Sequence, residues 1–157
     1  MQHFAERIVS ALAEAQCQFV IVGGLSAVLH GAPIVTQDLD VCYRRTPENL
    51  TRIAKALAPF DLRLRDIPEG VPDTFDRRSL DFGTNFTLAL RDGEEFDLLG
   101  EMAAIGGYDA IIGRSAEMEV AGHLIAVLSL EDLIRTARAA GRPKDLAALP
   151  ILEATLQ

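Results

Sequence analysis

The sequence predicts an α/β or α+β fold in which helices flank a mixed β-sheet. Segments with the apolar spacing of a helix alternate with short runs rich in β-branched residues, in the order helix, strand, helix, strand, helix, strands, helices. A chain of 157 residues with 49% hydrophobic residues can bury one core of this kind. No linker or low-complexity tract interrupts it, so we expect a single domain over residues 1–157, with a helical C-terminal segment over residues 128–157.

The first half of the chain alternates between the two periodicities. Residues 4–15 carry apolar side chains at the spacing of an amphipathic helix, and residues 19–22 form an apolar, β-branched run that predicts a buried strand. A short helix over residues 25–30 should follow, because Gly31 and a proline two positions later end it. Residues 37–43 read as the second strand.

The second half begins with a helix start at Thr46, which is an N-cap residue followed by proline, and this helix should end near residue 57 or 58. Residues 61–80 contain prolines and glycine, and they are expected to be irregular. The remaining predicted elements are a hairpin over residues 85–91 and 95–99 around Asp92-Gly93, short strands within residues 111–127, a helix over residues 130–140 capped by Ser129, and a terminal helix over residues 144–156.

Composition limits the function classes. The formal net charge of −8 and the isoelectric point near 4.8 argue against non-specific binding of nucleic acid. Cys17 and Cys42 form no CxxC pair, so they are expected to be reduced packing residues and not a zinc site. No apolar run approaches the ~18 residues of a membrane span, and no signal peptide is recognisable, which predicts a cytoplasmic location and no membrane contact.

Gly23 and Gly24 stand where the first predicted strand passes into a helix. Glycines at such a junction let the backbone approach a phosphate closely, and the free N–H groups at the helix start favour an anion. A Gly-Gly pair at a strand end can equally be only a tight turn. These two glycines therefore indicate a phosphate site only in combination with other residues.

Three acidic residues supply that combination. Asp38 and Asp40 lie two apart in a predicted strand, so their carboxylates should share one face. Like charges in apolar surroundings repel unless something neutralises them, and a divalent cation such as Mg²⁺ does so together with substrate phosphates. Asp97 is embedded in the apolar run of a later strand and would complete the set. Taken singly, each of these acids could be a solvated strand residue.

The arrangement resembles the nucleotidyltransferase fold of the DNA polymerase β superfamily. The matching motifs are Val22-Gly23-Gly24, then Asp38-Leu39-Asp40-Val41 after thirteen intervening residues, and Phe96-Asp97-Leu98. Residues 19–43, 95–100 and 128–150 are also similar to the small bacterial nucleotidyltransferases and the AbiEii-like toxins of abortive-infection systems. This resemblance implies transfer of a nucleotidyl group from a nucleoside triphosphate to an acceptor hydroxyl.

The resemblance also implies roles for individual residues. Asp38 and Asp40 would bind two Mg²⁺ ions, and Asp97 would complete the site and help to orient or deprotonate the acceptor. Together they are the implied catalytic and metal-binding residues. The implied nucleotide-binding residues are Gly23, Gly24, Ser26, Thr36 and Lys144. The hydroxyls of Ser26 and Thr36 could equally be local caps.

One residue departs from the pattern of these proteins. They often carry a basic residue four positions before the first aspartate, where this chain has Ile34. Another cation would then have to hold the triphosphate, and Lys144, Arg142 and Arg44 are the candidates. The alternative is a weakly active or inactive nucleotide-binding module, namely the toxin or partner half of a two-component system with an antitoxin. The acceptor could be a small molecule, a protein or an RNA end.

Overall fold

The computed structural model describes residues 3–36 and 38–157, and it contains a seven-stranded mixed sheet in the order β3-β4-β5-β2-β1-β7-β6. The strand bounds are β1 Phe19–Val22, β2 Leu39–Tyr43, β3 Arg63–Arg65, β4 Asn85–Ala89, β5 Glu95–Leu99, β6 Ala116–Val120 and β7 His123–Val127. The predicted fold class, a mixed sheet flanked by helices, is therefore confirmed.

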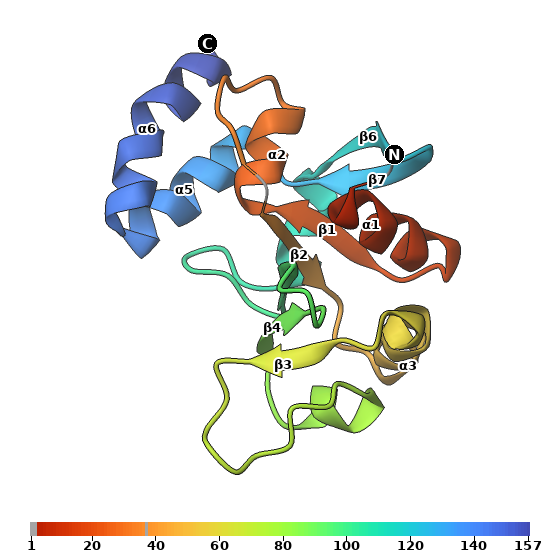
Figure 1. Cartoon of the computed structure of the whole chain (residues 1–157). Helices are drawn as coiled ribbons and strands as arrows, with labels where there is room; N and C mark the ends of the chain where they lie inside the picture. The colour runs from red at the N-terminus through yellow and green to blue at the C-terminus, as the bar shows by residue number, and fades with distance from the viewer. Residues whose placement is uncertain (1–2, 37) are drawn as a thin grey trace.

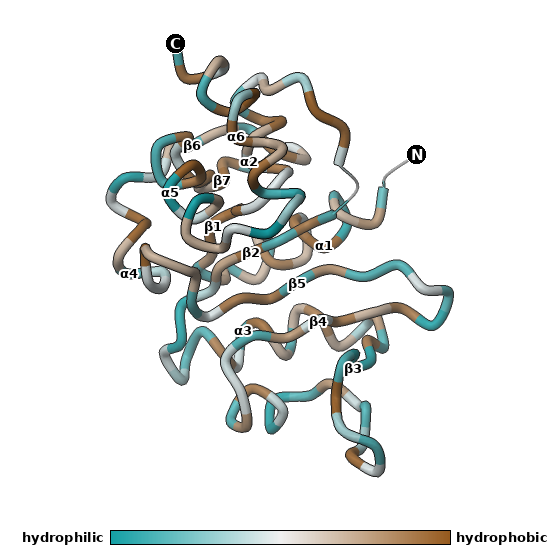
Figure 2. Tube along the Cα trace, turned by 90° about the vertical axis from the view of Figure 1, so that its left-hand side faces the viewer, coloured by the Kyte–Doolittle hydropathy of each residue, from teal (hydrophilic) through white to brown (hydrophobic). Residues whose placement is uncertain are grey.

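Helices cover both faces of the sheet. Their bounds are α1 Phe4–Glu14, α2 Gly23–Leu29, α3 Pro47–Leu57, α4 Tyr108–Ile111, α5 Leu130–Ala140 and α6 Pro143–Leu156. Figure 1 shows α1 and α3 on one side of the sheet and α5 and α6 on the other. In Figure 2 the latter side faces the viewer, and β4 and β5 lie below the helices with no helix in front of them.

The alternation of side chains along each strand explains these two layers. Ile21, Val41 and Leu98 point to the face under α1 and α3, where they join the larger apolar core. Val20, Val22, Cys42 and Leu99 point to the opposite face and pack with residues of α2, α5 and α6. The polar side chains of β2, β4 and β5 on this second face lie outside the area that the helices cover. This part of the sheet is therefore open to a functional site.

The centre of the sheet brings the predicted acidic strands together. β2 pairs with β1 in antiparallel fashion and with β5 in parallel, and the parallel register sets Asp40 directly beside Asp97. The antiparallel register sets Val22, the last residue of β1, beside Asp40. Three segments far apart in the sequence therefore meet at one end of adjacent strands.

Several local predictions are confirmed by the hydrogen bonds. The Asn49 backbone N–H donates to Oγ1 of Thr46 at the start of α3, and the Asp132 N–H donates to Oγ of Ser129 at the start of α5. The side chain of Asn49 does not close a capping box. Its amide donates to the carbonyls of Gln18 and Arg44 and so joins α3 to the sheet.

Three element predictions need correction. Helix α2 begins at Gly23 and not at Leu25. Strand β2 begins at Leu39, so Asp38 precedes the strand, while Gln37 lies outside the described residues. The region expected to be irregular, residues 61–80, contains β3 and most of a 3₁₀ segment at Arg77–Asp81. Helix α4 was also missed, because four residues are too few to show a helical period.

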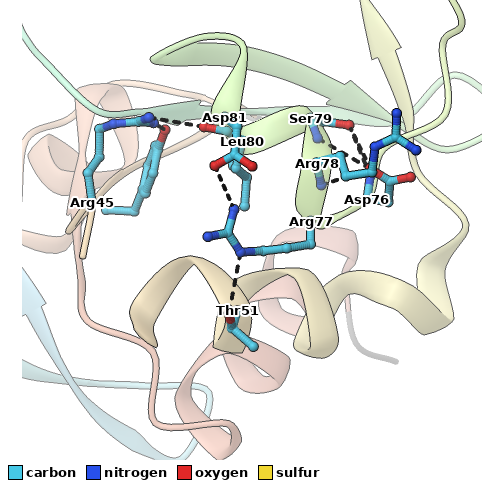
Figure 3. Close-up of polar contacts among 9 residues, drawn as sticks. Arg45, Thr51, Asp76, Arg77, Arg78, Ser79, Leu80 and Asp81 are labelled. Atoms are coloured by element: carbon cyan, nitrogen blue, oxygen red, sulfur yellow. Dashed lines mark hydrogen bonds and ion pairs between the residues drawn. The ribbon is translucent and has the colours of Figure 1, made fainter. Parts of the chain in front are cut away.

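The 3₁₀ segment is held by side chains that Figure 3 draws. Asp76 accepts from the backbone N–H groups of Arg78 and Ser79, and Arg77 bridges Thr51 of α3 and Asp81. Local polar contacts of this kind stabilise a segment that lacks apolar periodicity.

Both cysteines are free, as predicted, and burial raises the pKa of the Cys42 thiol to about 12. In the part of the chain that the structure describes, no helix is long and apolar enough to cross a membrane.

Candidate active site

A cleft of about 870 Å³ opens where β1 ends and β2 and β5 begin. Its floor is formed by the acidic strand residues Asp40 and Asp97, and one rim is formed by the segment that contains Ile34. Its apolar wall comes from α5 and α6, including Ala137 and Ile151. The cleft thus joins a polar floor to an apolar wall, which is the usual make-up of a small-molecule site.

Gly23 brings the backbone against one of these acids. Its φ of +67° lies in the left-handed region, and a Cβ atom at this position would collide with Oδ2 of Asp40. The strand-to-helix turn therefore needs glycine for two separate reasons, backbone conformation and space. Close approach of Gly23 to a phosphate stays a prediction, and the group that Gly23 approaches in the free protein is the Asp40 carboxylate.

Asp40 and Asp97 form an interacting pair. The pKa of Asp40 is raised from its ordinary value of 3.8 to about 7. Burial is the largest cause, the neighbouring carboxylates of Asp97 and Asp38 add to it, and the positive charge of Lys144 opposes it. Two carboxylates on adjacent parallel strands cannot both ionise without cost. Either a shared proton or a bound cation lowers that cost.

Asp38 stands apart from this pair. It is exposed, it lines the same cleft, and its backbone N–H donates to Oγ1 of Thr36. Among the described residues, no three His, Cys, Asp or Glu side chains are gathered closely enough to hold a metal ion. The expectation that one strand carries both Asp38 and Asp40 is wrong, because Asp38 precedes β2, but both residues line the cleft.

The donor set nevertheless fits Mg²⁺. This ion keeps several of its waters and is typically bound by one or two carboxylates together with substrate phosphates, without an all-protein cage. Asp40 and Asp97 are two such carboxylates, and the raised pKa of Asp40 shows that the site accommodates its negative charge poorly without a cation.

The remaining predicted nucleotide-binding residues divide into two groups. Gly24 and Thr36 both line the cleft, and a Cβ atom at Gly24 would lie 3.1 Å from Oγ1 of Thr36. Ser26 is fully buried, and its hydroxyl donates to the carbonyl of Gly23 at 2.6 Å. The observed contact of Ser26 is therefore a local hydrogen bond to the backbone within α2, and no side chain caps the start of this helix.

Two of the three candidate cations line the cleft. Lys144 and Arg142 lie at the start of α6, where the N-terminal end of a fourteen-residue helix adds positive potential. Asp145 accepts from Nε of Arg142 at 2.7 Å and from its second guanidinium nitrogen at 3.2 Å, which holds the guanidinium in place and lowers the pKa of Asp145. Arg44 follows the far end of β2 and stacks on Tyr108, so it does not reach the cleft.

The structure adds residues that the sequence did not single out. Asp145 holds Arg142, and Thr87 of β4 donates to Asp97. A signal for Thr87 was available, because a hairpin centred on Asp92 places residue 87 opposite residue 97.

Stability without metal should depend on pH through Asp40. The unfolded chain releases the Asp40 proton near its ordinary pKa of 3.8, whereas the folded protein keeps it up to a pKa of about 7. The contribution of Asp40 to the free energy of unfolding therefore falls as pH rises through this window and is lost above it. Asp97, Asp38 and Lys144 are the charged groups that act on Asp40.

Thermal denaturation with a chelator at about pH 5 and about pH 8 tests this expectation, with Asp40→Asn as the reference variant. Compared with the variant, the wild type should lose more stability between the two pH values. Parallel pH profiles for the two proteins would contradict the assignment.

Comparisons with known proteins bear on the fold. No family model and no curated protein matches the chain. Among solved structures, the antibiotic-resistance factor ANT(2'')-Ia aligns with a TM-score of 0.61 at 16% identity, over 96% of this chain and 81% of that one. The lincomycin-bound lincosamide antibiotic adenylyltransferase LnuA aligns with a TM-score of 0.64 at 9% identity, over 98% of each chain.

A third solved structure comes from Thermotoga maritima and is described as a nucleotidyltransferase. It aligns with a TM-score of 0.56 at 20% identity, over 92% of this chain and 86% of that one. The two acidic strands, the glycine turn and these alignments lead to one conclusion: the chain has the nucleotidyltransferase fold.

Proposed function

We propose that the protein is a Mg²⁺-dependent enzyme that transfers a nucleotidyl group from a nucleoside triphosphate to a hydroxyl of an acceptor. The observation that carries this proposal is the Asp40–Asp97 pair, set side by side by the parallel register of β2 and β5 and closed on one side by Gly23. Carboxylates placed in this way in a cleft can hold a metal ion and direct a hydroxyl toward a phosphorus atom.

Asp40 and Asp97 would hold Mg²⁺, and Asp38 would join them for a second ion at the mouth of the cleft. When bound, Mg²⁺ would lower the pKa of the acceptor hydroxyl and neutralise charge on the leaving pyrophosphate. Asp97 would orient the acceptor hydroxyl and accept its hydrogen bond. Gly23 would keep the backbone and Asp40 in contact, so that the carboxylate has little freedom to turn away.

Lys144 and Arg142 would bind the triphosphate. Both line the cleft at the start of α6, and the positive charge of Lys144 opposes the rise in the pKa of Asp40, which supports a role for Lys144 beside the acids. They would supply the positive charge that the chain lacks at Ile34. The apolar wall from α5 and α6 would exclude water from the reacting groups.

A small molecule is the acceptor we favour. Two of the structural neighbours are an antibiotic adenylyltransferase and a resistance factor that was also solved with adenylyl-2''-tobramycin. A cleft of about 870 Å³ lies within the size range of small-molecule sites, which supports a small acceptor.

The proposal is tested by incubating the protein with each of the four nucleoside triphosphates, Mg²⁺ and a panel of hydroxyl-bearing small molecules. Pyrophosphate release and an acceptor mass increased by one nucleotidyl group are expected, and a chelator should abolish both. Triphosphate binding by calorimetry without any product, under all of these conditions, would instead favour the inactive toxin or partner module.

A further inference from the structure

We propose that Thr87 is a positioning residue that fixes the orientation of the Asp97 carboxylate for metal binding and acceptor activation. This inference rests on the proposed function, because it assigns a role within the same site. Thr87 itself does not line the cleft, so it would act through Asp97 and not on the substrate.

The hydrogen bond is a direct cross-strand contact. In the antiparallel pairing of β4 and β5, Thr87 is the residue opposite Asp97, and its Oγ1 donates to Oδ1 of Asp97 at 2.8 Å. Side chains opposite each other on one sheet face lie within reach without any distortion of the strands. A hydroxyl that donates to a carboxylate makes a charge-assisted hydrogen bond, which is stronger than one between neutral groups.

The hydrogen bond from Thr87 adds to the contacts that restrict the movement of the two carboxylates. Asp40 is confined on one side by Gly23 and faces Asp97 on the other. Thr87 donates to the Asp97 carboxylate from β4, on the side of β5 opposite to β2 and Asp40. With Oδ1 engaged by Thr87, rotation of the Asp97 carboxylate is restricted, and the carboxylate would be held in one orientation for a metal ion or an acceptor hydroxyl. Outer contacts of this kind orient metal-binding carboxylates in proteins generally.

Two substitutions of Thr87 distinguish a positioning role from a contribution of this residue to the stability of the strand. Valine has nearly the shape of threonine and an equal preference for strands, so Thr87→Val keeps the β4 backbone pairing and removes only the donor. Thr87→Ser keeps the hydroxyl and loses a methyl group. The matched control is Thr51→Val on α3, where Oγ1 accepts from Nε of Arg77 on the far side of the sheet.

The test compares wild type, Thr87→Val, Thr87→Ser and Thr51→Val by calorimetric titration with Mn²⁺ in the presence of a nucleoside triphosphate, and by steady-state kinetics. We expect Thr87→Val to weaken metal binding or lower kcat by roughly 10- to 100-fold, with a much smaller change in KM for the acceptor. Thr87→Ser should retain most of the wild-type metal affinity, and Thr51→Val should retain all of it.

The outcomes distinguish this inference from the proposed function. A wild type that neither binds the metal nor forms product would overturn both. A wild type that binds the metal, while Thr87→Val binds it equally well and turns over equally fast, would overturn the role of Thr87 alone. If Thr87→Val fails to fold, the Thr87→Ser variant decides, since a tenfold loss there despite its hydroxyl would contradict positioning through the hydrogen bond.

Discussion

Replacement of Asp40 by asparagine is expected to abolish nucleotidyl transfer while it stabilises the metal-free protein. Asparagine keeps the shape of the side chain and removes the charge that burial and Asp97 disfavour, as the raised pKa of Asp40 shows. Activity should fall by more than about 100-fold, because outer-shell partners of metal ligands already contribute roughly 10- to 100-fold. The free energy of unfolding at about pH 8 should rise by at least about 1 kcal/mol.

The matched control is Glu95→Gln, two residues before Asp97 on the same strand face. Glu95 also lines the cleft but is exposed, so its neutralisation should leave stability within about 0.5 kcal/mol of wild type. Activity is measured by pyrophosphate release and stability by chemical denaturation in a chelator. An Asp40→Asn protein that turns over at the rate of Glu95→Gln would rule out the catalytic assignment of Asp40.

Gly23→Ala is the second substitution with a large expected effect. At a φ of +67° a Cβ atom strains the backbone by roughly 1–2 kcal/mol, and here it would also collide with Oδ2 of Asp40. To relieve that collision, either the turn or the Asp40 carboxylate must move. We therefore expect a loss of stability greater than the backbone strain alone, together with a loss of most activity.

Gly122→Ala separates the two causes. Gly122 has a φ of +81° in the turn between β6 and β7, and no atom lies within 4 Å of a Cβ atom placed there. Its substitution should cause the backbone strain without the collision and should leave transfer unchanged. Equal losses of stability and activity in the two variants would show that Gly23 is required for its conformation only.

Much of the fold could be predicted because the relevant signals are local. Apolar periodicity located α1, the capping residues Thr46 and Ser129 located α3 and α5, and the Asp92-Gly93 turn located the hairpin of β4 and β5. Strand β3 has three half-buried residues and no alternation to detect, and α4 is shorter than two helical turns. These elements are held by tertiary contacts, which a local pattern does not encode.

The candidate site also contains residues that the sequence could place and residues that it could not. Asp40 and Asp97 could be paired in advance because each acid interrupts an apolar strand, and the register of β2 and β5 places them together. The position of Asp38 could not be predicted, because the start of β2 depends on its pairing with other strands. The first residue of β2 that pairs with β1 is Asp40, so Asp38 lies outside this pairing. The hydrogen bond from Arg142 to Asp145 depends on side-chain geometry at the start of a helix, and no rule of residue spacing predicts this contact.

The central claim is that the cleft transfers a nucleotidyl group and not the terminal phosphoryl group. The most direct test supplies Mg²⁺, the acceptor and a nucleoside triphosphate labelled either at the α-phosphorus or at the γ-phosphorus. Transfer as proposed places the α-label in the acceptor and the γ-label in pyrophosphate, and Asp40→Asn should prevent both. Appearance of the γ-label in the acceptor, or α-label transfer that is unaffected by Asp40→Asn, would contradict the proposed function.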